Sequence, residues 1–138
     1  METLNFGSYP QGTNGEVMPI EWLVLDNSED KKLILSKYAL DCMPYNTNFE
    51  ETCWEKCSLR LWLNNEFFNK AFSEDEKSRI VLSEISADKN PDFDTNQGSD
   101  TQDKIFLLSV LESQKYFEND EERICWPTPY ANKIGVWK

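Results

Sequence analysis

The sequence predicts a single α+β domain over residues 1–138, built from a small antiparallel sheet and two to four short helices. Two β-rich runs, residues 20–25 and 32–36, flank a cluster of turn formers at 27–30, which is the pattern of a β-hairpin. Over residues 59–67, apolar side chains recur at steps of three and four, which is typical of an amphipathic helix. The 5 Trp, 5 Tyr and 8 Phe supply enough large rings for a core, despite a mean hydropathy of −0.64.

The first third of the chain is predicted to hold the strands. Residues 4–9 alternate apolar with small or polar side chains and stop at Pro10, so they predict a short strand that precedes the hairpin. Residues 11–15 are rich in turn formers and predict a loop. After the hairpin, an apolar segment at 38–45 leads into a polar loop that we expect at 46–52.

Three helices are predicted from their start signals. Ser58 is the expected N-cap of the helix over residues 59–67. Residues 73–76 and 109–112 both have the Ser-x-x-Glu spacing of a capping box, in which the Ser and Glu side chains bind each other's backbone N–H. Each box predicts a helix that begins there, and the second helix should run towards residues 116–117.

The rest of the second half is predicted to be mainly irregular. The polar, acidic segment 83–104 is expected to form a long loop, longer than compact domains usually carry without a purpose. An apolar run at 105–108 predicts a strand directly before the last capping box. Residues 125–130 contain two prolines and are expected to lack regular structure.

The charge of the chain disfavours several classes of partner. It has 14 Lys and Arg against 25 Asp and Glu, a net charge of −11, so phosphate backbones and anionic headgroups are repelled. We therefore expect no nucleic-acid partner and no membrane partner. No apolar run approaches the roughly 20 residues of a membrane span, and residues 1–5 lack the basic start of a signal peptide, so a cytoplasmic location is predicted.

The residue types that are missing argue against an enzyme. The chain has 0 His, which excludes Ser-His-Asp and Cys-His nucleophiles and His-ligated metal hydrolases within it. Its 5 Gly do not form a phosphate-binding loop of the Walker or dinucleotide type. The sequence therefore predicts no catalytic residues and no cofactor.

Cys42, Cys53, Cys57 and Cys125 are expected to be free thiols, because the cytosol is reducing. Two alternatives stay open. One is a Cys53–Cys57 or Cys42–Cys57 disulfide, and the other is a zinc site, for which only the Cys53-x-x-x-Cys57 half has a suitable spacing.

One acidic segment has the oxygen-rich spacing of a calcium loop. Its residues at loop positions 1, 3, 5, 7, 9 and 12 are Asp92, Asp94, Asn96, Gly98, Asp100 and Asp103. Gln97 stands where an EF-hand loop needs glycine, and position 12 lacks the usual glutamate. We read the segment as a solvated surface loop, with a Ca²⁺ site over residues 92–103 as the alternative.

Four aromatic residues are the predicted ligand-facing positions, because they offer flat faces on which a sugar ring or a peptide proline can stack: Tyr45, Trp54, Trp126 and Tyr130. Packing within the core is the alternative for each. Trp22 and Trp62 are expected to be buried, because they lie on the apolar phase of a strand and of a helix. Arg60 is expected to bind a nearby carboxylate or carbonyl group.

Six blocks of the chain carry a family resemblance. In order they are FGSYPQ (6–11), IEWLVLD (20–26), LSKYALDC (35–42), CSLRLWLNNEFF (57–68), AFS (71–73) and TQDKIFLLS (101–109). On these blocks the chain resembles a large bacterial family of uncharacterised domains that is frequent in gut Firmicutes. Longer members are similar to the C-type-lectin-like fold of formylglycine-generating enzymes. The resemblance implies a C-type-lectin-like fold or a truncated version of it, with this chain as the N-terminal part of a longer module.

The resemblance also implies that ligand-facing residues lie largely in the second half of such a module. An open sheet edge towards the C-terminus is then expected, which a second copy of the chain would cover. The leading hypothesis is a non-enzymatic binding or interaction module with a protein or carbohydrate ligand. A calcium-binding or metal-dependent protein centred on residues 92–103, and a truncated fragment without independent function, are the alternatives.

Overall fold

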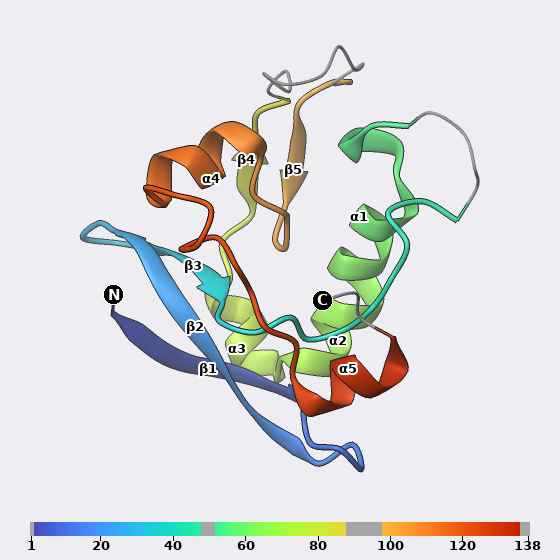
Figure 1. The fold of residues 1–138 in the computed structure, drawn as a ribbon. Coiled ribbons are helices and arrows are strands. Elements are labelled where there is room, and N and C mark those ends of the chain that lie inside the picture. Colours follow the sequence, from blue (N-terminus) through green and yellow to red (C-terminus); the bar gives the residue numbers. More distant parts are fainter. Residues whose placement is uncertain (1, 48–51, 88–97, 136–138) are drawn as a thin grey trace. The chain divides into compact units, whose positions relative to one another are not determined.

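The computed structural model describes residues 2–47, 52–87 and 98–135. The chain divides into two compact units, and each is described by itself. Unit 1 comprises Met1–Cys42, Ala71–Glu76 and Ile124–Lys138, and unit 2 comprises Met43–Lys70 and Lys77–Arg123. Antiparallel sheets and short helices occur together, so the predicted α+β class is confirmed (Figure 1).

Unit 1 contains a three-stranded antiparallel sheet in the order β1-β2-β3, drawn from blue to cyan in Figure 1. The predicted N-terminal strand and the predicted hairpin are both confirmed. Alternating residues of β2 are buried, namely Ile20, Trp22 and Val24, as the two-residue period of a half-buried strand requires. The strands are β1 (Thr3–Pro10), β2 (Val17–Asn27) and β3 (Lys32–Ser36).

The core of unit 1 closes around Trp22, which is 9% exposed as expected. Its indole N–H donates to the Phe6 carbonyl oxygen over 2.7 Å, which satisfies the only polar atom of this side chain. The Phe72 ring stacks on it with centroids 6.4 Å apart and also contacts the Phe6 ring at 5.5 Å. Residues from β1, β2 and the 71–76 segment thus share one aromatic cluster.

Strand β1 is irregular at Gly7, where its register with β2 shifts between Asn5 and Ser8. Gly7 has a φ of 71°, a conformation that residues with a Cβ rarely adopt. Its N–H donates to a carboxylate oxygen of Glu76 over 2.9 Å. A Cβ at this position would lie 2.6 Å from the Phe72 ring and 2.8 Å from the Ala71 carbonyl oxygen, so only glycine fits.

Tyr9 is the largest fully buried side chain in unit 1, with 1% of its surface exposed. Its hydroxyl donates to the Asp41 carboxylate, and the Tyr130 ring packs edge-on against it at 6.5 Å. Burial, together with the hydrogen bond to Asp41 and its negative charge, raises the pKa of Tyr9 well above its ordinary value. The folded chain therefore keeps the Tyr9 proton to a higher pH than the unfolded chain does.

This raised pKa predicts a loss of stability at high pH. An unfolded tyrosine titrates near pH 10, so above that pH the unfolded chain loses a proton that folded Tyr9 retains. The free energy of unfolding should stay level up to about pH 10 and then fall by up to about 1.4 kcal/mol per pH unit for this group. Chemical denaturation between about pH 9 and 11 measures the slope. Tyr9→Phe should reduce it, and an equal slope in that variant would contradict the assignment.

Unit 1 ends in helix α5 (Pro129–Ile134), so the prediction that residues 125–130 lack regular structure is wrong at their end. Pro129 occupies the first helical position, where its missing N–H costs nothing and its fixed φ suits the helix. The Thr128 hydroxyl caps the helix by accepting from the Ala131 N–H over 3.1 Å. Before the helix, Pro127 forms an isolated parallel bridge with Ala39.

In unit 2 the predicted central helix is confirmed, but its start differs. The helix runs without a break through α1 (Ser58–Trp62), the π-helical turn η2 (Leu63–Phe67) and α2 (Phe68–Ala71). Cys57 is the N-cap, so the prediction of Ser58 is wrong. Groups from the preceding loop replace a local cap: the Asn46 side-chain oxygen accepts from Ser58 N–H, and the Tyr45 carbonyl accepts from Leu59 N–H. Trp62, expected to be buried, is partly exposed.

Both capping boxes are confirmed. The Glu76 and Ser73 side chains exchange hydrogen bonds with each other's N–H at the start of α3 (Glu74–Arg79). Ser109 and Glu112 do the same at the start of α4 (Val110–Tyr116). The spacing alone was sufficient here because a capping box involves residues within one helical turn.

The predicted loop 83–104 is corrected at its two ends, which pair as an antiparallel ribbon in unit 2. Its strands are β4 (Ser83–Ile85) and β5 (Thr101–Asp103). The apolar run at 105–108, expected to be a strand, has no regular structure. These strands are three residues long and mostly polar, so hydrophobic periodicity could not reveal them.

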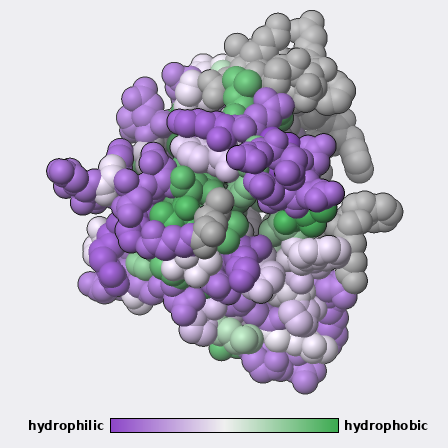
Figure 2. Space-filling view, turned by 60° about the vertical axis from the view of Figure 1, so that its left-hand side comes forward, coloured by the Kyte–Doolittle hydropathy of each residue, from purple (hydrophilic) through white to green (hydrophobic). Residues whose placement is uncertain are grey.

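The face shown in Figure 2 is mainly hydrophilic, with hydrophobic residues in smaller patches, as a chain with 28% charged residues leads one to expect. Among the helices of the described ranges, none has both the length and the hydrophobicity needed to cross a bilayer.

Candidate functional site

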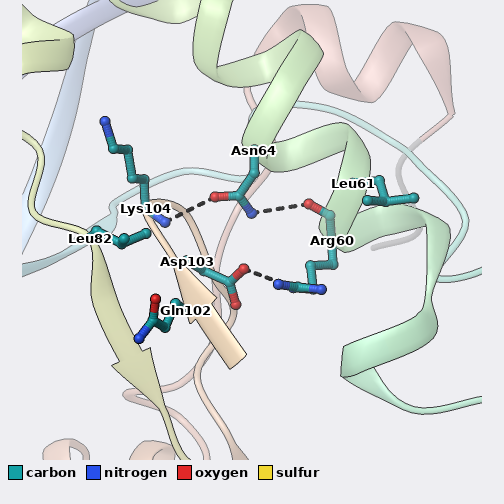
Figure 3. A pocket seen from close by; sticks show the side chains of 7 residues that line it. All are labelled: Arg60, Leu61, Asn64, Leu82, Gln102, Asp103 and Lys104. Atoms are coloured by element: carbon teal, nitrogen blue, oxygen red, sulfur yellow. Dashed lines mark hydrogen bonds and ion pairs between the residues drawn. The ribbon is translucent and has the colours of Figure 1, made fainter. Parts of the chain in front are cut away.

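Unit 2 carries an open pocket of about 260 Å³ between helix α1 and the β4–β5 ribbon (Figure 3). The helix supplies one wall, β5 and the residue that follows it supply the opposite wall, and Leu82 precedes β4. The seven lining residues are Arg60, Leu61, Asn64, Leu82, Gln102, Asp103 and Lys104.

The side chain of Asn64, which lies on the central helix, hydrogen-bonds to the backbone that follows β5. Its side-chain N–H donates to the Ile105 carbonyl over 2.8 Å and to the Arg60 carbonyl over 3.0 Å. Its side-chain oxygen accepts from the N–H groups of Lys104 and Ile105, over 2.9 and 3.0 Å. One amide thus holds two successive backbone groups, and this contact sets the position of Lys104 in the pocket (Figure 3).

Asp103 is the buried charge of the site, with 2% of its surface exposed. One carboxylate oxygen accepts from Arg60 Nε over 2.7 Å. The other oxygen accepts from the Trp54 indole N–H over 2.9 Å and from the Thr101 hydroxyl over 2.6 Å. Because both oxygens are held by donors of unit 2, this carboxylate is suited to organising the pocket rather than to accepting a substrate proton.

Arg60 connects the carboxylate to the turn η1 (Trp54–Lys56). Its Nη1 donates to the Glu55 carbonyl over 3.1 Å, while its Nε is bound to Asp103. The expectation that Arg60 binds a local carboxylate or carbonyl group is confirmed, since it binds one of each. Its Nη2 makes no hydrogen bond to the residues that the structure describes, and the side chain is 24% exposed.

The mouth of the pocket combines aliphatic and cationic groups. Leu61 and Leu82 are 60% and 56% exposed and belong to opposite walls. The Lys104 ammonium lies 5.1 Å from the centre of the Phe68 ring, a cation–π distance that orients this side chain. Exposed leucines of this kind lose contact with water when a ligand covers them, which favours binding.

The four aromatic residues predicted to face a ligand are divided between the units. Tyr45 and Trp54 belong to unit 2, whereas Trp126 and Tyr130 belong to unit 1. Trp54 serves Asp103 as a hydrogen-bond donor, and Tyr130 is partly buried against Tyr9.

Tyr45 and Trp126 are 42% and 64% exposed. Partial burial and the neighbouring Cys57 thiol raise the pKa of Tyr45 to about 12. None of the four predicted aromatic residues is among the seven that line the pocket. Sequence reasoning did not find Asn64, Gln102 or Lys104, although Asn64 lies four residues after Arg60 and so on the same helix face.

The calcium alternative lies partly outside the described residues, since Asp92, Asp94 and Asn96 are among those that the structure leaves out. Of the remaining positions, Asp100 accepts from the Ala87 N–H over 2.7 Å, and Asp103 is held as described above. Within the described ranges, no group of three or more His, Cys, Asp or Glu side chains is arranged to hold a metal ion.

All four cysteines are free thiols in the structure, as expected. Cys53 and Cys57 are buried, and the Cys57 thiol donates to the Trp54 carbonyl over 3.4 Å. Gly98 packs directly on the Cys53 sulfur, since a Cβ there would approach it to 2.5 Å. The two buried thiols therefore act as core residues around the η1 turn that carries Trp54.

The described elements define an α+β protein whose unit 2 carries an open, mixed aliphatic and cationic pocket between one helix and a two-stranded ribbon. The chain belongs to the family described as Domain of unknown function (DUF6273), whose match covers residues 29–134, more than half of the chain. The expected membership of an uncharacterised domain family is thereby confirmed, and the matched range includes every residue of the pocket. Comparison with curated proteins and with solved structures gave no match.

Proposed function

We propose that the chain is a non-enzymatic binding module that takes an extended segment of a partner protein in the pocket of unit 2. The observation that carries this proposal is the exposure of Leu61 and Leu82, 60% and 56%, beside the cationic groups of Arg60 and Lys104. The preferred segment presents one aliphatic side chain to each of the two leucines, which lie on opposite walls, and a carboxylate to the Arg60 guanidinium (Figure 3). Gln102, exposed on β5, supplies an amide for the partner's backbone.

A peptide suits this pocket better than a carbohydrate does. Proteins bind sugar rings largely through the flat faces of aromatic side chains, and the seven lining residues include no aromatic ring. The polar groups beneath the mouth, Asp103 and Asn64, are already bound within unit 2, so they hold the walls rigid. A preformed pocket of this kind reduces the ordering cost of binding a flexible segment.

The proposal is tested by selecting ligands from a display library of short random peptides. We expect selected peptides to share an aliphatic residue next to Asp or Glu, and their affinity to fall about tenfold for Leu61→Ser, which removes one buried aliphatic contact worth roughly 1–2 kcal/mol. Leu111→Ser is the matched control, because Leu111 is a 45% exposed leucine on helix α4 of the same unit and does not line the pocket.

Two outcomes would overturn this function. One is a selection without a shared sequence pattern, and the other is equal binding by the Leu61→Ser and Leu111→Ser variants. A glycan array run in parallel tests whether the ligand is a carbohydrate instead. Glycan binding that is unchanged in Leu61→Ser would show that the glycan binds outside the pocket.

A further inference from the structure

Strand β3 lies at an edge of the sheet in unit 1, since it pairs with β2 on one side only. The direction of its free backbone groups follows from the register. Lys37 N–H donates to the Glu21 carbonyl, and hydrogen-bonded pairs alternate along an antiparallel ladder, so Leu35 also faces its partner Leu23.

Ile34 and Ser36 therefore direct their N–H and C=O groups away from β2. The hydrogen bonds on the other side of β2 are consistent with this assignment. The Val24 N–H points away from β3 and donates to the Glu2 carbonyl. In the described ranges, no residue hydrogen-bonds to these outward groups of Ile34 and Ser36. An edge with two unused donors and two unused acceptors can accept an added strand.

The side chains of this edge combine apolar and positive character. Three half-buried aliphatic residues occupy its centre, residues 33–35. Lys31 and Lys32 precede them, and Lys37 follows them. Residues 31–37 thus carry three lysines and no acidic residue on a chain whose net charge is −11, and Glu29 and Asp30 come directly before them.

The lysines are only weakly engaged within the chain. Lys32 is 3.8 Å from a Glu2 carboxylate oxygen, and Lys37 is 3.4 Å from that of Glu21. Both pairs are solvent-exposed, and such pairs contribute little and exchange readily. The lysines therefore remain able to attract acidic groups of an incoming strand.

The same lysines oppose pairing between two copies of the chain. If two β3 strands met antiparallel about Ile34, Lys31 of each copy would lie opposite Lys37 of the other. Like charges directly opposite each other in a ladder are destabilising. In this register the lysines oppose a second copy, whereas a strand of opposite charge is favoured.

We infer that β3 is a docking edge for an extended segment of another protein, apolar at its centre and flanked by Asp or Glu at both ends, which adds to the sheet as a fourth strand. This inference concerns unit 1 and goes beyond the pocket function proposed for unit 2. Main-chain hydrogen bonds to Ile34 and Ser36 supply the affinity, and the lysines select the flanking charges.

The test uses a synthetic peptide of alternating Val and Thr flanked by two Glu residues on each side. Titration into the isotope-labelled full chain should shift the amide signals of Ile34 and Ser36. N-methylation of alternate peptide bonds, which removes the donors, should abolish binding. Ser36→Pro should weaken binding at least about tenfold, because it removes one outward N–H and leaves the ladder to β2 intact.

A second experiment exchanges the charges of the lysines and of the peptide. Lys31→Glu combined with Lys37→Glu should reduce binding of the Glu-flanked peptide about tenfold and should restore binding of a Lys-flanked peptide. The Leu61→Ser variant should bind the Glu-flanked peptide as tightly as the wild type does. This result would distinguish binding at the β3 edge from binding in the pocket of unit 2.

Three results would overturn the inference: equal binding of the N-methylated peptide, no preference for the opposite charge in the exchanged variant, or a dimer that dissociates in Ser36→Pro. The last result would identify a second copy as the occupant of the edge.

Discussion

Replacing Asp103 by alanine should lower the free energy of unfolding by about 3–5 kcal/mol, the cost of leaving a largely buried partner charge without its counter-ion. The substitution removes the acceptor for Arg60, Trp54 and Thr101 together. Asp103→Asn should also be strongly destabilising, because an amide N–H₂ in place of the second oxygen would meet the Trp54 indole N–H, donor against donor. Equilibrium urea denaturation followed by circular dichroism measures both variants.

Asp100→Ala is the matched control for this prediction. Asp100 lies three residues earlier, is exposed, and accepts one hydrogen bond from the Ala87 N–H. Its loss should cost no more than about 1 kcal/mol, the net value of one exposed hydrogen bond. Similar losses for Asp100→Ala and Asp103→Ala would show that the network around Asp103 is not specially stabilising.

Gly7→Ala should strongly destabilise unit 1, with a loss of about 2–5 kcal/mol. The positive φ of 71° costs an alanine about 1–2 kcal/mol. The overlap of its Cβ with the Phe72 ring and the Ala71 carbonyl adds about 1–3 kcal/mol. Thermal unfolding of the variant should show a lower midpoint, and the hydrogen bond from Gly7 N–H to Glu76 should weaken as the strand shifts.

Gly15→Ala separates the two contributions to this loss. Gly15 has a φ of 79°, but no atom lies within 4 Å of the position of an added Cβ. It should therefore show only the conformational cost, about 1–2 kcal/mol. Equal destabilisation by the two alanines would mean that the contact of Gly7 with Phe72 and Ala71 contributes nothing.

Local signals predicted much of the fold, and contacts between distant residues account for what was missed. The hairpin and both capping boxes depend on neighbours in sequence, and they were found. Ser58 failed as an N-cap because Asn46 and Tyr45, twelve and thirteen residues before it in sequence, supply the caps instead. The α5 helix was missed because Pro129 was taken as a breaker, although proline is favoured at a first helical position.

In the candidate site, too, local sequence predicted some features, and contacts between distant residues determine the others. The kind of partner that Arg60 binds was predictable, because an arginine at a helix start commonly ties a carboxylate or carbonyl. Its actual partner, Asp103, is 43 residues away, and the sequence had placed that carboxylate in a solvated surface loop, with a calcium site as the alternative. The pocket therefore depends on the meeting of residues 57–68 with residues 101–109, which no local periodicity encodes.

The discontinuity of unit 1 determines when it can be completed during synthesis. Its sheet comes from Met1–Cys42, but the Glu76 acceptor for Gly7 and the Phe72 ring that covers Trp22 belong to Ala71–Glu76, and helix α5 belongs to Ile124–Lys138. At a ribosome speed of roughly 5–20 residues per second, the apolar face of β2 waits roughly 2–10 s for Ala71–Glu76 and roughly 5–20 s for the segment that holds α5. Unit 1 therefore contains strands made before all of unit 2, yet it is complete only after the residues of unit 2 have been made.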